Sequence, residues 1–343
     1  MAYSNINKPN EYFNTKLYTG NGTGQSITGV GFQPDFVWCK RRSTSGQNFL
    51  QNIVQGTNKA LFSDSTSAEF TGGVDGGTSV TSFDSDGFTL GTEGGINGSG
   101  GTFASWNWLA GGTGVSNTQG SIASTVSANT TAGFSVVSWT GNSGTVGHGL
   151  GQKPACIIIK SKQSVNNWVV VNQGLGTMSG NVLVLNTTGA ASGGGAGQVE
   201  PTANVFTITS GLAANDNNIG YVFAEKKGFS KFGGYTGNGS TNGTFVYTGF
   251  KPAFVMIKCT SSGTTQWRMY DDKRDTYNPV YKELNANTSD AENASTRYHD
   301  FVSNGFKMRD TNVNTNGSGS TYIYMAFAEN PLVGTNNIPT TAR

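Results

Sequence analysis

One short phrase occurs three times in this chain, and this repetition limits its possible folds more than any other feature. The phrase is Tyr-Thr-Gly-Asn or Trp-Thr-Gly-Asn, and it stands at residues 18–21, 139–142 and 235–238. Each copy leads to a proline that opens an apolar run closed by a lysine, at residues 34–40, 154–160 and 252–258. Self-similarity of this kind is typical of a chain built from one structural unit used repeatedly. We therefore expect a single unit written three times.

Further landmarks follow the lysine in the same order in each copy. They are an aromatic residue, a leucine that leads into small polar residues, a turn followed by a strand, and a closing aromatic strand. The aromatic residues are Phe49, Trp168 and Trp267, and the leucines are Leu61, Leu185 and Leu284. The closing strands are expected at residues 103–108, 219–225 and 322–329. The second copy is the least faithful, because Asn204 stands where the other two have Gly87 and Gly305.

Composition favours a globular all-β protein. Hydrophobic residues make up 35% of the 343-residue chain and charged residues only 12%, with 50 glycines. Aromatic residues, at 11%, fall at strand-like positions, so the disordered class is excluded. A net charge of +2 gives no basic field for nucleic acid. No apolar stretch is long enough to span a bilayer, and residues 1–10 lack the apolar core of a secretory signal.

The fold class that we expect is all-β, with three tandem antiparallel β-sandwich repeats of jelly-roll kind. The expected boundaries are residues 1–110 for the first repeat, 111–132 for a Gly/Ser/Thr linker, 133–228 and 229–331 for the second and third repeats, and 332–343 for an extended tail. The linker could supply a short edge strand through Ile122, Ala123, Val126 and Ala128. Each repeat has the usual size of a domain and could bury its own core. Whether the repeats share strands is left open.

The proline-to-lysine runs are almost continuously apolar, which indicates strands that are covered on both faces or that lie in the centre of a sandwich. Two of the three cysteines lie in these runs. Cys39 matches Ile159 and Ile257 in the other copies, and Cys156 matches Phe36 and Phe254, so both are interpreted as packing residues. The basic triplet at residues 40–42 is interpreted as a solvated strand end rather than a phosphate clamp. The best candidate for a helix is the segment 279–285.

Reactive groups are sparse. The chain has two histidines, and we interpret His148 as part of a turn or surface and His299, which precedes Asp300, as a capped surface residue rather than a general base. Neither a nucleophile elbow nor a zinc-ligand spacing occurs in the sequence. We therefore expect no catalytic residue, no metal site and no cofactor.

The densest polar cluster lies at residues 267–277, and it is the candidate ligand site. Its aromatic residues could stack on a sugar and its carboxylates could accept hydrogen bonds from hydroxyls or hold calcium. The residues predicted for this site are Trp267, Tyr270, Asp271 and Asp272. The alternative is a loop with mutually compensating charges, and the match of Trp267 with Trp168 and Phe49 favours a core position for it.

At several segments the chain resembles a group of virion structural proteins of marine tailed phages. The segments that carry the resemblance are residues 6–22, 83–88, 243–255, 322–331 and 338–343. Proteins of that group are described as fibre-like or decoration proteins with concanavalin-like (SPRY-type) β-sandwich repeats. The resemblance covers nearly the whole chain and implies a place on the virion surface for a protein made in the host cytoplasm. It supplies no catalytic residues to carry over.

The leading hypothesis is a non-enzymatic structural protein of the virion surface, either a head decoration or a tail-associated fibre or adhesin. Its expected partners are other capsid or tail proteins, with an oligomeric arrangement in the virion and neither nucleic acid nor membrane insertion. The second hypothesis is a glycan-binding module for host attachment that uses the cluster at Trp267. A polysaccharide depolymerase ranks last, because only Asp271 and Asp272 form a conspicuous carboxylate pair.

Overall fold

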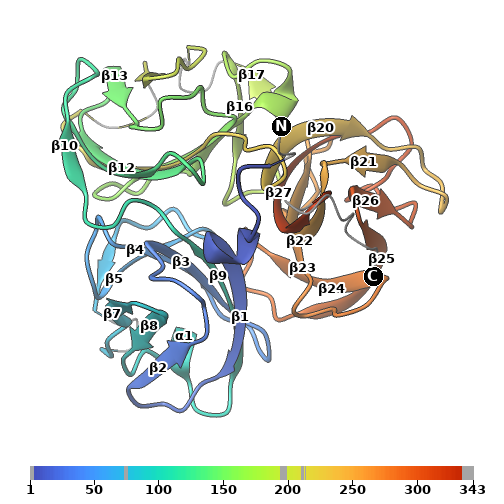
Figure 1. The fold of residues 1–343 in the computed structure, drawn as a ribbon, viewed down its shortest axis with the longest axis horizontal. Coiled ribbons are helices and arrows are strands. Elements are labelled where there is room, and N and C mark those ends of the chain that lie inside the picture. The colour runs from blue at the N-terminus through green and yellow to red at the C-terminus, as the bar shows by residue number, and fades with distance from the viewer. Residues whose placement is uncertain (1–3, 73–75, 194–198, 210–211, 213, 334–343) are drawn as a thin grey trace.

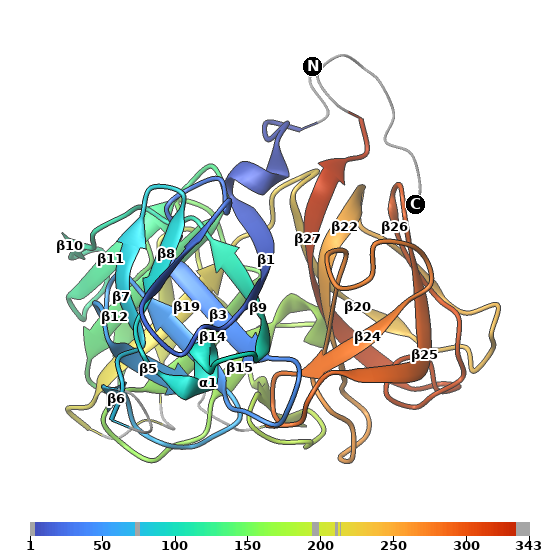
Figure 2. The ribbon, with the colours of Figure 1, turned by 90° about the horizontal axis from the view of Figure 1, so that it is seen from below.

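The computed structural model describes residues 4–333 apart from 73–75, 194–198, 210–211 and 213. Helix is confined, within these residues, to the 3-10 turns η1 (Pro9–Glu11) and η2 (Gln173–Leu175) and the one-turn α1 (Gly94–Asn97). Everything else that is regular is strand, so the all-β expectation is confirmed. None of the described helices is long and apolar enough to cross a membrane. The strands form three lobes around a common centre, and η1 lies beside the end of the last strand (Figures 1 and 2).

Lobe 1 holds two sheets, with strand orders β1-β9-β3-β4-β5-β6 and β2-β8-β7. All pairs are antiparallel. The strands are β1 (Phe13–Thr19), β2 (Gln25–Thr28), β3 (Phe36–Arg41), β4 (Asn48–Asn52), β5 (Lys59–Phe62), β6 (Phe70–Thr71), β7 (Val80–Asp84), β8 (Gly87–Leu90) and β9 (Thr102–Trp108).

Lobe 2 holds sheets of order β10-β11-β12-β19-β14-β15-β16-β17 and β13-β18. The strands are β10 (Val115–Asn117), β11 (Ser124–Asn129), β12 (Phe134–Thr140), β13 (Gly144–Gly147), β14 (Cys156–Ser161), β15 (Val169–Asn172), β16 (Asn181–Val184), β17 (Ser192–Gly193), β18 (Val205–Ile208) and β19 (Asn217–Phe223). Two of these strands lie in the tract expected to be a linker. The tract is therefore part of lobe 2, because β11 pairs with six of the seven residues of β12 and buries Val126.

Lobe 3 is one sheet that bends back on itself, in the order β20-β27-β22-β23-β24-β25-β26-β21. The strands are β20 (Ser230–Thr236), β21 (Phe245–Tyr247), β22 (Phe250–Cys259), β23 (Arg268–Asp271), β24 (Val280–Asn285), β25 (Asn293–Val302), β26 (Gly305–Met308) and β27 (Thr321–Pro331). The helix expected at 279–285 is wrong, since β24 occupies this segment. Val280 and Leu284 lie in different cores although they are four residues apart, because the pairing of β24 with β25 shifts register between Val280 and Lys282.

The lobes do not bury their cores separately. One large apolar core lies between them and takes side chains from the facing sheets of all three, and a smaller core lies inside each lobe. Aromatic residues dominate the shared core, which includes Phe36, Trp38, Trp106 and Trp108 from lobe 1, Phe134, Trp168, Tyr221 and Phe223 from lobe 2, and Phe254, Trp267 and Phe327 from lobe 3. Each lobe therefore buries a core of its own, as expected, but each also contributes side chains to the shared core, which was not expected.

The proline-to-lysine runs explain how a sheet serves two cores. In β3, Phe36 and Trp38 face the shared core, whereas Val37 and Cys39 face the core of lobe 1. The corresponding residues of β14 and β22 alternate in the same way, which confirms that these strands are covered on both faces. All three cysteines are free and buried, and Cys39 and Cys156 pack as expected.

The lysine that closes each run is fully buried, so the solvated strand end expected at residues 40–42 is wrong for Lys40. Each ammonium group donates to a backbone carbonyl of another lobe. The contacts are Lys40 Nζ to Thr288 O (3.0 Å), Lys160 Nζ to Thr66 O (3.1 Å) and Lys258 Nζ to Thr188 O (3.0 Å). They run from lobe 1 to lobe 3, from lobe 2 to lobe 1 and from lobe 3 to lobe 2, and so close a ring.

Two more sets of contacts follow the same ring. Side-chain donors directly opposite the lysines bind carbonyls of the next lobe: Asn48 Nδ2 to Asn285 O (3.1 Å), Trp168 Nε1 to Phe62 O (2.8 Å) and Trp267 Nε1 to Val184 O (3.0 Å). Backbone bonds join Glu292 N to Arg42 O (2.9 Å), Glu69 N to Lys162 O (2.7 Å) and Ala191 N to Thr260 O (2.9 Å). The lobes therefore meet through hydrogen bonds as well as through apolar packing.

The strand registers correct two of the landmarks. Asn48 lies opposite Lys40 in the β3–β4 pair, and this is the position that Trp168 and Trp267 occupy in their lobes, so Phe49 is one residue out of line. In lobe 2 the leucine that pairs into the sheet is Leu183 rather than Leu185. In lobe 2 two leucines stand two residues apart, and only the pairing partner shows which of them belongs to the sheet.

The wild-type protein is expected to gain stability relative to Lys160→Met as the pH rises from about 8 to 10.5. Burial lowers the pKa of Lys160 from 10.5 to about 8, with Asp216 opposing the shift. Between these pH values the unfolded chain binds more protons than the folded one, so raising the pH favours the folded state. The expected gain is roughly 1–3 kcal/mol, measured as the difference between the two urea unfolding free energies. The control is Lys8→Met, a substitution at an exposed position. The prediction is contradicted if the difference in unfolding free energy between wild type and Lys160→Met changes with pH no more than the difference between wild type and Lys8→Met.

Candidate functional site

The four residues predicted to bind a ligand are all buried. Trp267 and Asp272 are 1% exposed, and Tyr270 and Asp271 are 0% exposed. A sugar that stacks on an aromatic ring needs one face of the ring open to solvent. The described structure gives no such face at Trp267, so the predicted site is part of the interior.

Strand geometry also separates these residues from one another. Successive side chains of β23 point to opposite faces, so Tyr270 lies in the core of lobe 3 while Trp267 lies in the shared core. Asp271 faces Trp106 of lobe 1, whose indole N–H donates to Asp271 Oδ2 at 3.1 Å. Residues that are close in the sequence thus serve different contacts, and the structure does not bring the four together as one site.

The charges of this cluster join lobe 1 to lobe 3. Arg274 Nε lies 2.5 Å from Asp271 Oδ2 in a pair with no exposed side-chain surface, and Arg274 Nη1 lies 3.3 Å from Glu292 Oε2. Arg42 holds Glu292 through two bonds of 2.8 Å. Burial opposes ionisation of Glu292, but the hydrogen bonds and charges of Arg42 and Arg274 lower its pKa overall. The alternative interpretation of the cluster, mutually compensating charges, is the one that the contacts support.

A second buried polar group surrounds Glu283 inside lobe 3. Its carboxylate accepts from Arg268, Arg297 and the Tyr270 hydroxyl, the last at 3.2 Å. His299 packs with its ring 4.3 Å from that of Tyr270 and is fully buried, so the expected surface position is wrong. Burial lowers the pKa of His299, which favours the neutral ring.

The contacts of both histidines are those of residues that hold the fold together. Asp300, next to His299 in the sequence, points to the opposite face of β25 and pairs with Arg309 at 3.3 Å, so the two form no acid–base pair. His148 Nδ1 accepts from Leu150 N, and Nε2 lies 3.3 Å from Thr202 O, which fixes a buried turn. Over the described part of the chain, no group of three or more His, Cys, Asp or Glu side chains is placed to hold a metal ion.

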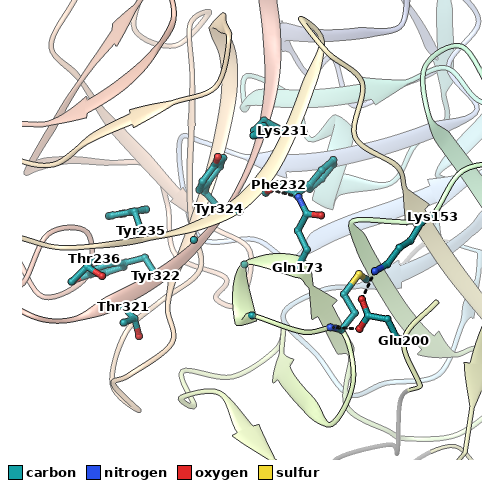
Figure 3. Close-up of a pocket in the computed structure, with 15 residues that line it drawn as sticks. Lys153, Gln173, Glu200, Lys231, Phe232, Tyr235, Thr236, Thr321, Tyr322 and Tyr324 are labelled. Carbon is teal, nitrogen blue, oxygen red and sulfur yellow. Dashed lines mark hydrogen bonds and ion pairs between the residues drawn. The ribbon is translucent and has the colours of Figure 1, made fainter. Parts of the chain in front are cut away.

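An open groove of about 740 Å³ lies between lobes 2 and 3 (Figure 3). One wall is β20, with the adjacent part of β27, and the other is η2 with the segments around Lys153 and Glu200. The aromatic side chains of Tyr235, Tyr322 and Tyr324 line the β20 wall. The groove is therefore a boundary between lobes, where the sheet edge of one lobe faces a turn of the other.

The charges along this groove are compensated. Lys153 pairs with Glu200, and Lys231 Nζ lies 2.5 Å from Glu225 Oε1. Gln173 donates to Phe232 O at 2.6 Å and so ties η2 to the backbone of β20. The groove consequently presents polar groups without a net charge, which suits an uncharged polar ligand better than an anion or a cation.

Sequence reasoning did not find this groove. The one local signal was the pair Gly233-Gly234, which replaces the Lys16-Leu17 of β1 and the Val137-Ser138 of β12 at the same strand positions. A Cβ on Gly234 would lie 2.7 Å from Gly174 O, so η2 approaches β20 closely only because this position has no side chain. In the sequence of lobe 3 alone, two adjacent glycines indicate only a weakened strand, because nothing there shows that another lobe packs against them.

Fold and groove together define an all-β protein with three lobes, one shared aromatic core and one uncharged polar groove between two of the lobes. A family model described as a domain of unknown function, DUF7483, matches residues 8–331. The chain therefore belongs to this family. Neither the curated proteins nor the solved structures contain a match to the chain.

Proposed function

We propose that the chain consists of three copies of one antiparallel β-sandwich repeat of jelly-roll, concanavalin-like kind. The support is that corresponding residues make corresponding contacts. Lys40, Lys160 and Lys258 each close the strand that ends the proline-to-lysine run, and each reaches a carbonyl of another lobe. Three equivalent contacts in a closed ring follow simply from one unit used three times about a common axis.

We infer that this protein is a non-enzymatic structural protein of a phage virion surface, either a head decoration or a tail-associated fibre or adhesin. The observation that carries the proposal is the shared aromatic core, because a core closed by three lobes makes a rigid particle in which no lobe needs to move. The resemblance of the sequence to virion proteins of tailed phages points to the same role. Fold alone would not indicate function.

The proposal includes the partners and the location. The protein would be made in the host cytoplasm and would bind other capsid or tail proteins in an oligomeric arrangement. Glycan binding through Trp267, Tyr270, Asp271 and Asp272 is not carried forward, since these side chains are buried. A depolymerase that uses Asp271 and Asp272 is not carried forward either, because Asp271 is engaged by Arg274 and Trp106.

The protein is expected to be found on purified virions of the phage that encodes it. Mass spectrometry of the purified particles and cryo-EM of the same preparation are the measurements, and the three-lobed shape of Figure 1 is the density to look for. Density over the head lattice would identify a decoration protein, and density at the tail would identify a fibre or adhesin. Presence in the infected-cell lysate but absence from purified virions would contradict the proposal.

A further inference from the structure

The strand β20 is one edge of its sheet, and β21 is the other. Strand β20 pairs with β27 along its length, and no other strand of the described chain lies on its second side. Phe229 O accepts from Ala328 N and Gly237 N donates to Ser320 O, so the odd-numbered residues between them bond to β27. In an antiparallel pair the alternate residues point their N–H and C=O groups the other way. The backbone groups of Phe232, Gly234 and Thr236 therefore face outward, toward the groove.

Some of these outward groups have partners and others do not. Phe232 O accepts from Gln173, and Thr236 O accepts from the Thr244 hydroxyl at 2.8 Å. Within the described chain, the N–H and C=O of Gly234 and the N–H of Thr236 make no hydrogen bond. Both residues are exposed, and both line the groove. Unpaired backbone groups along a strand edge are a template for an added strand.

The molecule already contains such an addition at the corresponding edge of lobe 2. There β11 pairs with β12 over six residues, and Ser138, which stands where lobe 3 has Gly234, faces Thr125. The segment that fills this edge carries no charge and alternates buried and exposed residues at Ser124, Thr125 and Val126. Among the described residues lobe 3 has no equivalent of β11, and only the short segment 224–229 separates β19 from β20.

We propose that the groove along β20 binds an extended, uncharged segment of a partner polypeptide, which adds to the sheet antiparallel to β20 through Gly234 and Thr236. The compensated pairs Lys153–Glu200 and Lys231–Glu225 favour an uncharged occupant. Strand addition supplies affinity through main-chain hydrogen bonds and takes specificity from the side chains that flank the edge. The inference concerns the groove alone and holds whether or not the protein is a virion component.

The probe is a dye-labelled peptide that copies residues 122–130 of this chain, Ile-Ala-Ser-Thr-Val-Ser-Ala-Asn-Thr, added to the full-length protein. Fluorescence anisotropy measures binding, and hydrogen exchange measures the Gly234 amide. In the free protein this amide should exchange fast while those of Gly233 and Tyr235, bonded to β27, exchange slowly. Saturating peptide should slow exchange at Gly234 by at least about tenfold and leave the two neighbours unchanged.

Thr236→Pro tests the edge directly. It removes an outward N–H without breaking a bond to β27, and proline is tolerated on a free strand edge. We expect peptide affinity to fall roughly fivefold to tenfold, the effect of one lost hydrogen bond. The matched control is Thr19→Pro, the same change at the corresponding exposed position of β1, which should bind the peptide as the wild type does.

Three outcomes would overturn the proposal. The first is the lack of saturable binding by the peptide, and the second is binding that leaves exchange at Gly234 unchanged. The third is protection of Gly234 by a neutral glucan oligosaccharide but not by the peptide, which would assign the groove to a sugar.

Discussion

Trp108→Ala is expected to lower the free energy of unfolding by about 3–5 kcal/mol and to loosen all three lobes together. Trp108 is 2% exposed and lies at the centre of the shared core. Its ring lies near aromatic rings of every lobe: Phe13 at 4.9 Å and Phe36 at 5.0 Å in lobe 1, Phe134 at 6.5 Å and Phe223 at 6.4 Å in lobe 2, and Phe254 at 6.2 Å and Phe327 at 5.6 Å in lobe 3. Truncation would leave a cavity that no single lobe can close.

The matched control for this experiment is Trp139→Ala. Trp139 is buried to a similar degree, at 3% exposed, but it lies in the core of lobe 2, and its ring lies 5.4 Å from that of Phe206 of the same lobe. Both substitutions should cost a similar free energy, measured by urea unfolding. The distinction lies in native-state hydrogen exchange, which should rise in the sheets of all three lobes for Trp108→Ala and first in lobe 2 for Trp139→Ala. Faster exchange confined to lobe 1 in Trp108→Ala would show that the lobes are independent.

Removal of the Asp271 carboxylate is expected to have the second large effect. Asp271→Ala should destabilise the protein by about 3–5 kcal/mol, because it leaves the buried guanidinium of Arg274 without its nearest counter-charge. It also removes the acceptor for the Trp106 indole and for the backbone N–H groups of Lys273 and Arg274. Burial disfavours the charge on Arg274, but Asp271 and Glu292 together raise its pKa, so the charge stays in place.

Two further variants make this prediction specific. Asp300→Ala removes an aspartate whose partner Arg309 is 45% exposed, and it should cost no more than about 1 kcal/mol. The double variant Asp271→Ala/Arg274→Met should be more stable than the sum of the two single changes predicts, because it removes the unpaired charge. Additive effects, or a cost for Asp271→Ala no larger than for Asp300→Ala, would contradict a structural role. Loss of any activity in an Asp271 variant would need this stability control before it is assigned to catalysis.

Much of the fold could be predicted from the sequence. The apolar runs at 34–40, 154–160 and 252–258 predicted strands covered on both faces, and the structure has β3, β14 and β22 there. The match of Cys39 with Ile159 and Ile257 predicted one packing position in three copies, and all three face the core of their own lobe. These predictions succeed because side-chain alternation is a local property of a strand.

The candidate site could not be predicted in the same way. Trp267, Tyr270, Asp271 and Asp272 looked like a polar surface loop because charge and aromatic content usually indicate exposure, yet these side chains bind Val184 of lobe 2, Glu283 of lobe 3, Trp106 of lobe 1 and Lys273. Two of these partners, Val184 and Trp106, lie far away in the sequence and belong to other lobes. The groove was missed for the same reason, since its two walls come from lobes 2 and 3 and neither contains a motif.

The sequence by itself determined the threefold repetition, the β class and the strands that must be covered on both faces. Only the tertiary structure decided what covers them: a shared core in addition to the core of each lobe, and lysines turned inward to the carbonyls of another lobe. It also left the edge of β20 at Gly234 without a strand partner among the described residues. The physical reason is the range of the interactions. Alternation and turn chemistry act between neighbours along the chain, whereas burial and pairing depend on which distant surfaces meet.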